Sequence, residues 1–72
     1  MSAERKILEF LAEKHLARRE DLIKVLDGVA NAKNVVNAAC ESLVAQGYLS
    51  PVSPIGPTCY VITQKGMRAL RG

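Results

Sequence analysis

The side chains that most often carry out catalysis or bind metals are few in this sequence. Cys40 and Cys59 lie too far apart for a CxxC redox motif, and no further cysteine or second histidine completes a zinc site. We expect both cysteines to be reduced and to pack as small apolar residues, with a disulfide between them as the less favoured alternative. His15, the single histidine, falls at the end of a predicted helix, where a surface cap is favoured over a general base.

Sequence motifs of known catalytic sites are also missing. The chain contains no glycine-rich phosphate loop, no nucleophile elbow and no carboxylate pair with an evident pocket. The sequence therefore predicts a protein that is not an enzyme and that uses neither a metal ion nor a cofactor.

Three cations stand at predicted helix starts, where they are placed to bind anions. Arg18 and Arg19 open one helix and Lys33 opens another, and at both places the backbone N–H groups and the helix dipole also favour a negative charge. The phosphate oxygens of a nucleic-acid backbone are the expected ligand. The alternative is a solvated basic end neutralised by Glu20 and Asp21, and the sequence leaves the two open.

Length and composition limit what the chain can be. Its 72 residues, 49 % hydrophobic and 24 % charged, predict one folded domain over residues 1–72 and not a disordered tail. No apolar run approaches the roughly 18 residues that span a bilayer. Charges stand where a signal peptide would have its apolar segment, so we expect no membrane partner and a cytoplasmic location. The net charge of +3 permits binding to phosphate but does not require it.

Hydrophobic periodicity predicts two helices near the N-terminus. The first covers residues 2–15, with Ser2 as its N-cap, and the second covers residues 18–28, with Gly28 at its end. Residues 16–17 are expected to form only a short connector. The apolar positions are Ala3, Ile7, Leu8, Phe10 and Leu11 in the first helix and Leu22, Ile23, Val25 and Leu26 in the second.

A third helix, a hairpin and a closing helix follow. The third helix covers residues 32–46, with Asn31 as N-cap and Gly47 in a left-handed conformation at its end. Segments 48–52 and 59–63 predict two strands joined by a proline-rich tip, and Thr63 is expected to cap the helix 64–72. The expected buried positions are Ala32, Val36, Ala39, Cys40 and Leu43 in the third helix and Met67 and Leu70 in the last.

Two stretches resemble a known family of DNA-binding proteins. "LVAQGYL", from Leu43 to Leu49, has a leucine four residues before a glycine and then a hydrophobic pair. "YVITQKGMRAL", from Tyr60 to Leu70, has a strand-to-helix pattern of an aromatic residue, apolar residues, a threonine, two polar residues and a glycine. In both, the chain is similar to winged helix-turn-helix transcription regulators, particularly small bacterial and archaeal members of the MarR and PadR type. The resemblance implies a mainly α fold with a small β-hairpin, in the order helix, helix, helix, strand, strand, helix.

In such a fold the third helix would enter the major groove of double-stranded DNA and turn its unburied side to the bases. That side carries Asn34, Asn37, Ala38, Glu41 and Ala45, with Lys33 at its edge. Asparagine can pair with adenine N6 and N7, and alanine can touch a thymine methyl group. We therefore expect sequence-dependent DNA binding in transcription regulation, more plausibly as a homodimer than as a monomer. The alternative is an ordinary solvated surface on which Glu41 repels phosphate.

The expected wing departs from the family pattern, because it has no lysine or arginine before Lys65. Prolines recur at positions 51, 54 and 57 of the hairpin and stiffen it, and its apolar Val52 and Ile55 could pack on a partner protein or insert at the minor groove of DNA. A second hypothesis is thus a winged-helix protein interaction module in a larger nucleic-acid-processing assembly.

Two further sets of side chains have open interpretations. Lys65, Arg68 and Arg71 give the last helix a basic side, which either reaches a neighbouring phosphate or keeps a small protein soluble. Tyr48 and Tyr60 could stack on bases, but their alternation with Leu49 and Ile62 favours a hairpin that faces the core.

Overall fold

The first helix has the predicted apolar face. The computed structural model describes residues 3–52 and 58–71, and in it helix α1 covers Ala3–Lys14. Ile7, Leu8 and Leu11 are buried at the spacing expected for one side of a helix. The predicted N-cap Ser2 lies outside the described residues. At the other end His15 is exposed and has φ +70°, and its backbone N–H donates to the Leu11 carbonyl at 2.6 Å.

The segment predicted to be a connector is a β-strand. Strand β1 covers Leu16–Arg18 and pairs antiparallel with strand β3, Cys59–Ile62. The prediction of a connector, and of a second helix that begins at Arg18, was therefore wrong. A strand of three residues is too short to show a period of two in the sequence, and its pairing partner lies far along the chain.

Helices α2 and α3 have the predicted faces but differ at their ends. Helix α2 covers Arg19–Val25, shorter than predicted, and Gly28 lies beyond it in a turn with φ +92°. Helix α3 covers Ala32–Ala45. Asn31 precedes it with φ +57° but makes no side-chain cap hydrogen bond, so the predicted cap was right in position only. The left-handed conformation predicted for Gly47 is confirmed by its φ of +82°.

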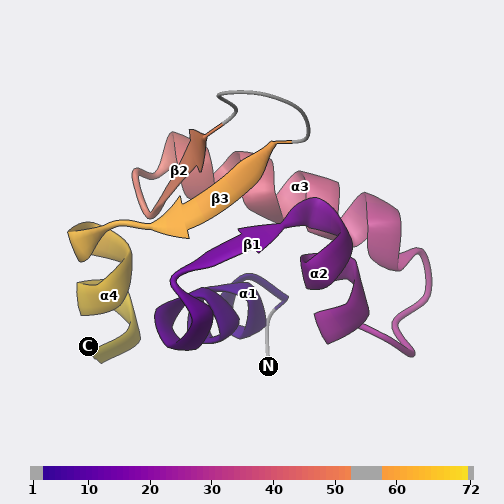
Figure 1. The fold of residues 1–72 in the computed structure, drawn as a ribbon. Coiled ribbons are helices and arrows are strands. Elements are labelled where there is room, and N and C mark those ends of the chain that lie inside the picture. Colours follow the sequence, from indigo (N-terminus) through magenta and orange to yellow (C-terminus); the bar gives the residue numbers. More distant parts are fainter. Residues whose placement is uncertain (1–2, 53–57, 72) are drawn as a thin grey trace.

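The hairpin and its exit are as predicted. Strand β2, Leu49–Val52, pairs antiparallel with β3, which is the central strand of a sheet in the order β1-β3-β2. Helix α4 covers Gln64–Arg71 and continues from β3, at the end of the sheet away from α2 (Figure 1). The Thr63 side chain accepts from the Gly66 backbone N–H at 3.1 Å, which confirms the predicted cap. The proline-rich tip, residues 53–57, lies outside the described residues.

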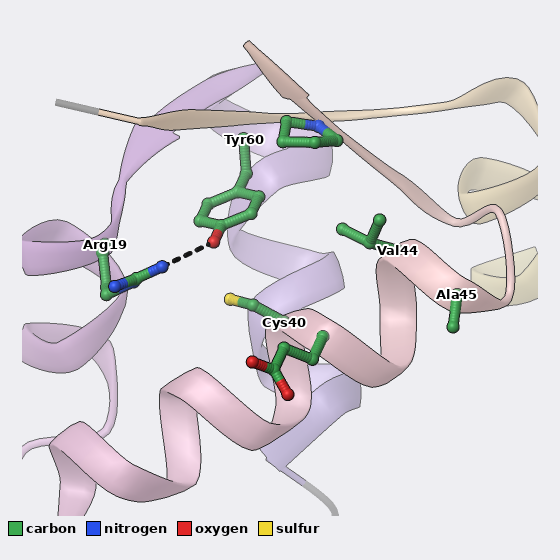
Figure 2. A pocket seen from close by; sticks show the side chains of 7 residues that line it. Arg19, Cys40, Val44, Ala45 and Tyr60 are labelled. Carbon is green, nitrogen blue, oxygen red and sulfur yellow. Dashed lines mark hydrogen bonds between the residues drawn. The ribbon is translucent and has the colours of Figure 1, made fainter. Parts of the chain in front are cut away.

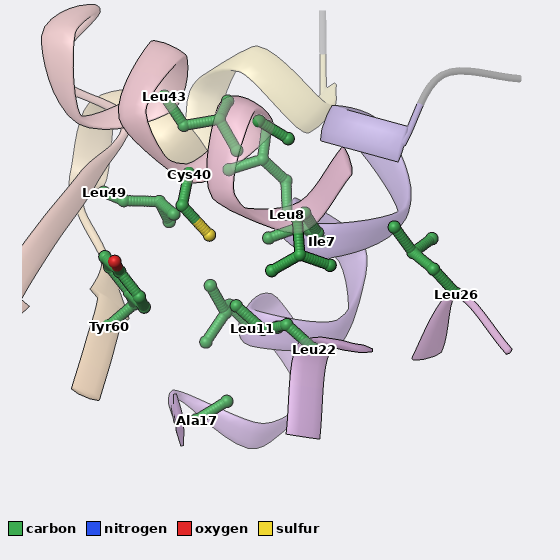
Figure 3. Close-up of a cluster of buried hydrophobic side chains, with 12 residues drawn as sticks. Ile7, Leu8, Leu11, Ala17, Leu22, Leu26, Cys40, Leu43, Leu49 and Tyr60 are labelled. Carbon is green, nitrogen blue, oxygen red and sulfur yellow. The ribbon is translucent and has the colours of Figure 1, made fainter. Parts of the chain in front are cut away.

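Side chains from helices α1, α2 and α3 and from the three strands form one core (Figure 3). These helices pack their apolar sides against one another and against one face of the sheet. Leu70 of α4 packs against this cluster. Met67 is only half-buried. The completely or almost completely buried side chains are Ile7, Leu8, Leu11, Ala17, Leu22, Leu26, Val36, Ala39, Cys40, Leu43, Leu49 and Tyr60.

Close packing explains why Gly66, a poor helix former, stands near the start of α4. A Cβ atom at this position would lie 2.5 Å from the Tyr48 carbonyl oxygen and 2.8 Å from the Ile62 side chain. Only a glycine lets α4 approach the hairpin this closely, so the loss of helix propensity is offset by packing.

The described residues are thus mainly helical, with four helices and a small three-stranded antiparallel sheet. This layout is compatible with a winged helix, and it adds strand β1 to the predicted order of elements. Among the described residues, no helix is both long and apolar enough to cross a membrane.

Candidate nucleic-acid interface

The side of α3 that faces away from the core carries the residues predicted for base contact. Lys33, Asn34 and Ala38 are exposed, as are Glu41 and Ala45 one and two turns further on. The buried side of the same helix consists of Val36, Ala39, Cys40 and Leu43. This division follows the period of 3.6 residues and leaves one side of α3 open to a ligand.

Asn37 differs from the other predicted contacts. Its side chain is half-buried, and its Oδ1 is buried without a hydrogen-bond partner among the described residues. A buried acceptor that lacks a donor costs free energy. Asn37 therefore lies at the margin of the exposed side, and its carbonyl oxygen is turned away from solvent.

Arg19 is held beside α3 by a contact that the sequence did not suggest. Its Nη2 donates to the Tyr60 hydroxyl of β3 at 3.0 Å, across 41 residues of sequence (Figure 2). This hydrogen bond raises the pKa of Arg19, with a smaller contribution from the Glu41 charge. Tyr60 itself is only 6 % exposed, so the expectation that it faces the core is confirmed.

Arg18 adjoins Arg19 in sequence but belongs to a different surface. It is the last residue of β1 and lies opposite Cys59, whereas Ala17 lies opposite Tyr60. Because strand side chains alternate between faces, Arg18 lies on the face of the sheet away from Tyr60. Its backbone N–H donates to the Asp21 carboxylate at 3.2 Å, which ties down the start of α2.

The structure does not bring the predicted lysines together. Lys33 is exposed in the first turn of α3. Lys65 lies near the other end of that helix, with its Nζ 5.6 Å from the centre of the Tyr48 ring. The 14 residues of α3 separate the two cations by about 20 Å. Tyr48, half-buried under Lys65, is thus only partly covered by the protein.

A cavity of about 400 Å³ lies between α3, the hairpin and the start of α2, and we call it the α3–hairpin cavity. Its polar lining consists of Arg19, Tyr60 and Glu41, and its apolar lining of Cys40, Val44, Ala45 and Pro51. Figure 2 shows Arg19 and Tyr60 toward one end of this space and Val44 and Ala45 toward the other. Sequence reasoning did not find the cavity, because its residues come from four elements.

The thiol that lines this cavity is not activated. Cys40 is completely buried, and burial raises its pKa, although the nearby Arg19 charge partly opposes the shift. The thiol is therefore protonated at neutral pH. Neither cysteine forms a disulfide bond, as expected from their spacing.

A second hollow, of about 350 Å³, lies on the outer side of α4 and is lined by Gln64, Met67, Arg68 and Arg71. These positions repeat at the helical period, so one helix alone forms the surface. Two cations of the predicted basic side, Arg68 and Arg71, thus lie beside Met67, whereas the third, Lys65, lies over the Tyr48 ring.

The face of the sheet away from Tyr60 exposes apolar side chains. We call it the outer sheet face, and it consists of two cross-strand rows: Leu16, Val61 and Ser50, and Arg18, Cys59 and Val52. Leu16 is 54 % exposed and Val52 is 40 % exposed. In the part of the chain that the structure describes, no group of three or more His, Cys, Asp or Glu residues is placed to hold a metal ion.

Neither a protein-family model nor a curated protein matches this chain.

Proposed function

We propose that this chain is a winged helix-turn-helix domain that binds double-stranded DNA with α3 in the major groove and acts in cytoplasmic transcription regulation. The observation that carries the proposal is the exposed side of α3, where Asn34 and Ala38 stand beside the cation Lys33. An α-helix fits the major groove, and short side chains let its backbone approach the bases. The element order and the three-stranded sheet support the same assignment.

Base contacts come from the N-terminal half of α3 in this proposal. The Asn34 amide donates to adenine N7 and accepts from N6, and the Ala38 methyl group touches a thymine methyl group. Glu41 lies further along the same side and limits how closely phosphates can approach there. The preferred site should therefore contain an A·T pair near the start of α3.

Phosphate contacts come from Arg19 at the start of α2 and from Arg18 at the end of β1. Arg19 uses one N–H on the Tyr60 hydroxyl and keeps its other donors for a phosphate next to α3. Arg18 serves a second phosphate on the outer side of the sheet. The sequence has no lysine or arginine from residue 46 to residue 64, so the hairpin adds no charge of its own. Because one module of this size gives limited specificity, binding as a homodimer is part of the proposal.

The test is a salt series with random duplex DNA, read by fluorescence anisotropy. The logarithm of the affinity should fall linearly with the logarithm of the salt concentration, and the R18A/R19A double variant should reduce the slope by about 2. The control is K6A/K14A, which removes two exposed positive charges from α1 and should change the slope little. Absence of binding at low salt would refute the proposal.

One observation favours a second function, that of a protein interaction module. Leu16 and Val52 expose large apolar side chains on the outer sheet face, where Val61 and Cys59 of the central strand lie between them. If the outer sheet face binds a partner protein, L16S/V52S should abolish capture of that partner and leave DNA affinity unchanged. A drop in DNA affinity with that variant would argue for a fold defect and against a protein interface.

A further inference from the structure

Two opposite charges face the α3–hairpin cavity without pairing. Arg19 and Glu41 both line it, and the Glu41 charge contributes to the raised pKa of Arg19. Yet no salt bridge joins these two side chains, both of which belong to the described part of the chain. The cavity thus has one positive and one negative group that a bound molecule can satisfy together.

Apart from Tyr60, the rest of the lining is apolar. Cys40 adjoins Glu41, and the apolar lining of α3 continues at Val44 and Ala45, about one helical turn beyond the charged pair. Val44 and Ala45 are placed there by α3, and Pro51 is placed by its pairing with Tyr60 across the hairpin. A ligand that fits must therefore combine a charged head at one end with an apolar body at the other.

We propose that the α3–hairpin cavity binds a free α-amino acid with an apolar side chain. Its carboxylate accepts from the Arg19 guanidinium, and its ammonium group donates to the Glu41 carboxylate. Its side chain lies against Val44, Ala45 and Pro51. The cavity volume of about 400 Å³ is near the lower end for small-molecule sites, roughly 300–1,000 Å³, and suits a ligand of this size.

Charge balance separates this ligand from the other candidates. A ligand with only a carboxylate would contact Arg19 but would be repelled by Glu41, and a ligand with only an amine would contact Glu41 but would be repelled by Arg19. A zwitterion satisfies both. Tyr60 positions the site, because its hydroxyl holds the Arg19 guanidinium toward the cavity. Both proposals use the Arg19 guanidinium, but amino-acid binding is measured without DNA, so its test is separate from that of the proposed function.

The experiment is a titration of the full chain, followed by two-dimensional amide NMR, with L-phenylalanine as the probe. We expect saturable shifts at Glu41, Val44 and Tyr60, with a dissociation constant on the order of 1 mM because the exposed Glu41 and Ala45 leave the cavity open to solvent. Three analogues test the three contacts. Phenethylamine lacks the carboxylate, 3-phenylpropanoate lacks the ammonium group and glycine lacks the apolar side chain, and each should bind about tenfold more weakly or worse.

The E41Q variant tests the ammonium contact. It should weaken phenylalanine about tenfold and leave 3-phenylpropanoate unchanged or tighter, because the repulsion of the carboxylate is removed. E13Q, which neutralises an exposed glutamate of α1, is the matched control and should leave both affinities unchanged. Circular dichroism of each variant checks that it is folded. The proposal is overturned if phenylalanine gives no saturable shift at several tens of millimolar, or if 3-phenylpropanoate binds as tightly as phenylalanine.

Discussion

The Arg19 guanidinium donates to the Tyr60 hydroxyl at 3.0 Å and so ties the start of α2 to the central strand of the sheet. The two residues are 41 positions apart in sequence. The contact fixes an arginine beside α3 that would otherwise be a mobile surface side chain. Both the proposed phosphate contact and the proposed amino-acid site depend on this placement.

Removing the hydroxyl should therefore have two measurable effects. In Y60F the ring stays in the core, but the hydrogen bond to Arg19 is lost, which should lower the free energy of unfolding by about 1 kcal/mol and the melting temperature by roughly 4–8 °C. DNA affinity should fall by less than in R19A, because the charge remains. Y48F is the control, since the structure gives the Tyr48 hydroxyl no hydrogen bond within residues 3–52 and 58–71. Equal losses in Y60F and Y48F would contradict a special role for the contact.

The two asparagines of α3 should behave differently. N34A should flatten the preference for an A·T pair in a selection from random duplexes and leave non-specific affinity nearly intact, because Asn34 is exposed and Lys33 remains. N37A should instead raise thermal stability slightly, because it removes a buried acceptor without a partner and introduces a better helix former. If N37A destabilises the fold by more than about 1 kcal/mol, its amide has a partner that the structure does not reveal.

The glycine in α4 should resist substitution. G66A gains helix propensity worth about 1 kcal/mol, but its methyl group would lie 2.5 Å from the Tyr48 carbonyl oxygen. Overpacking of this kind costs about 1–3 kcal/mol, so chemical denaturation should show a net loss of stability. Gly28 has open space around it, and G28A should show only the strain of its positive φ. A more stable G66A protein would mean that α4 does not pack closely on the hairpin.

The Cys40 thiol should react slowly and only at high pH. Burial raises its pKa, so its folded state favours the neutral form. The raised pKa therefore adds to the free energy of unfolding below pH 9.0, the ordinary pKa of the thiol in the unfolded chain. This contribution is lost as the pH rises through the pKa of the folded state. In native protein at neutral pH, iodoacetamide should alkylate Cys59 before Cys40, and both should react equally in denaturant. Mass spectrometry of the peptides measures the order, and faster reaction at Cys40 would show that the core opens there.

Much of the fold could be predicted from local pattern. The apolar spacing of Ile7, Leu8 and Leu11 identified the buried side of α1, and the alternation around Tyr60 identified a strand. Thr63 and Gly47 marked a cap and a turn because each acts on backbone groups a few residues away. These features depend on interactions within one element, so a single sequence contains them.

The candidate site was predicted in part. The exposed side of α3 followed from its helical period, and Lys33, Asn34 and Ala38 lie on it as expected. The placement of Arg18 and Arg19 on different surfaces could not be predicted, because the sequence pattern put both residues in one helix. Strand β1 separates them, and Arg19 then reaches Tyr60 while Arg18 lies on the outer sheet face.

The sequence by itself determined the helix faces, the hairpin and the side of α3 that is left open, since hydrophobic periodicity and turn chemistry act over a few residues. Only the tertiary structure decided that Leu16–Arg18 form a strand, that Gly66 touches the hairpin and that Arg19, Glu41 and Pro51 line one cavity. Those contacts join segments that are far apart in sequence. Their geometry depends on how whole elements pack, which no local pattern encodes.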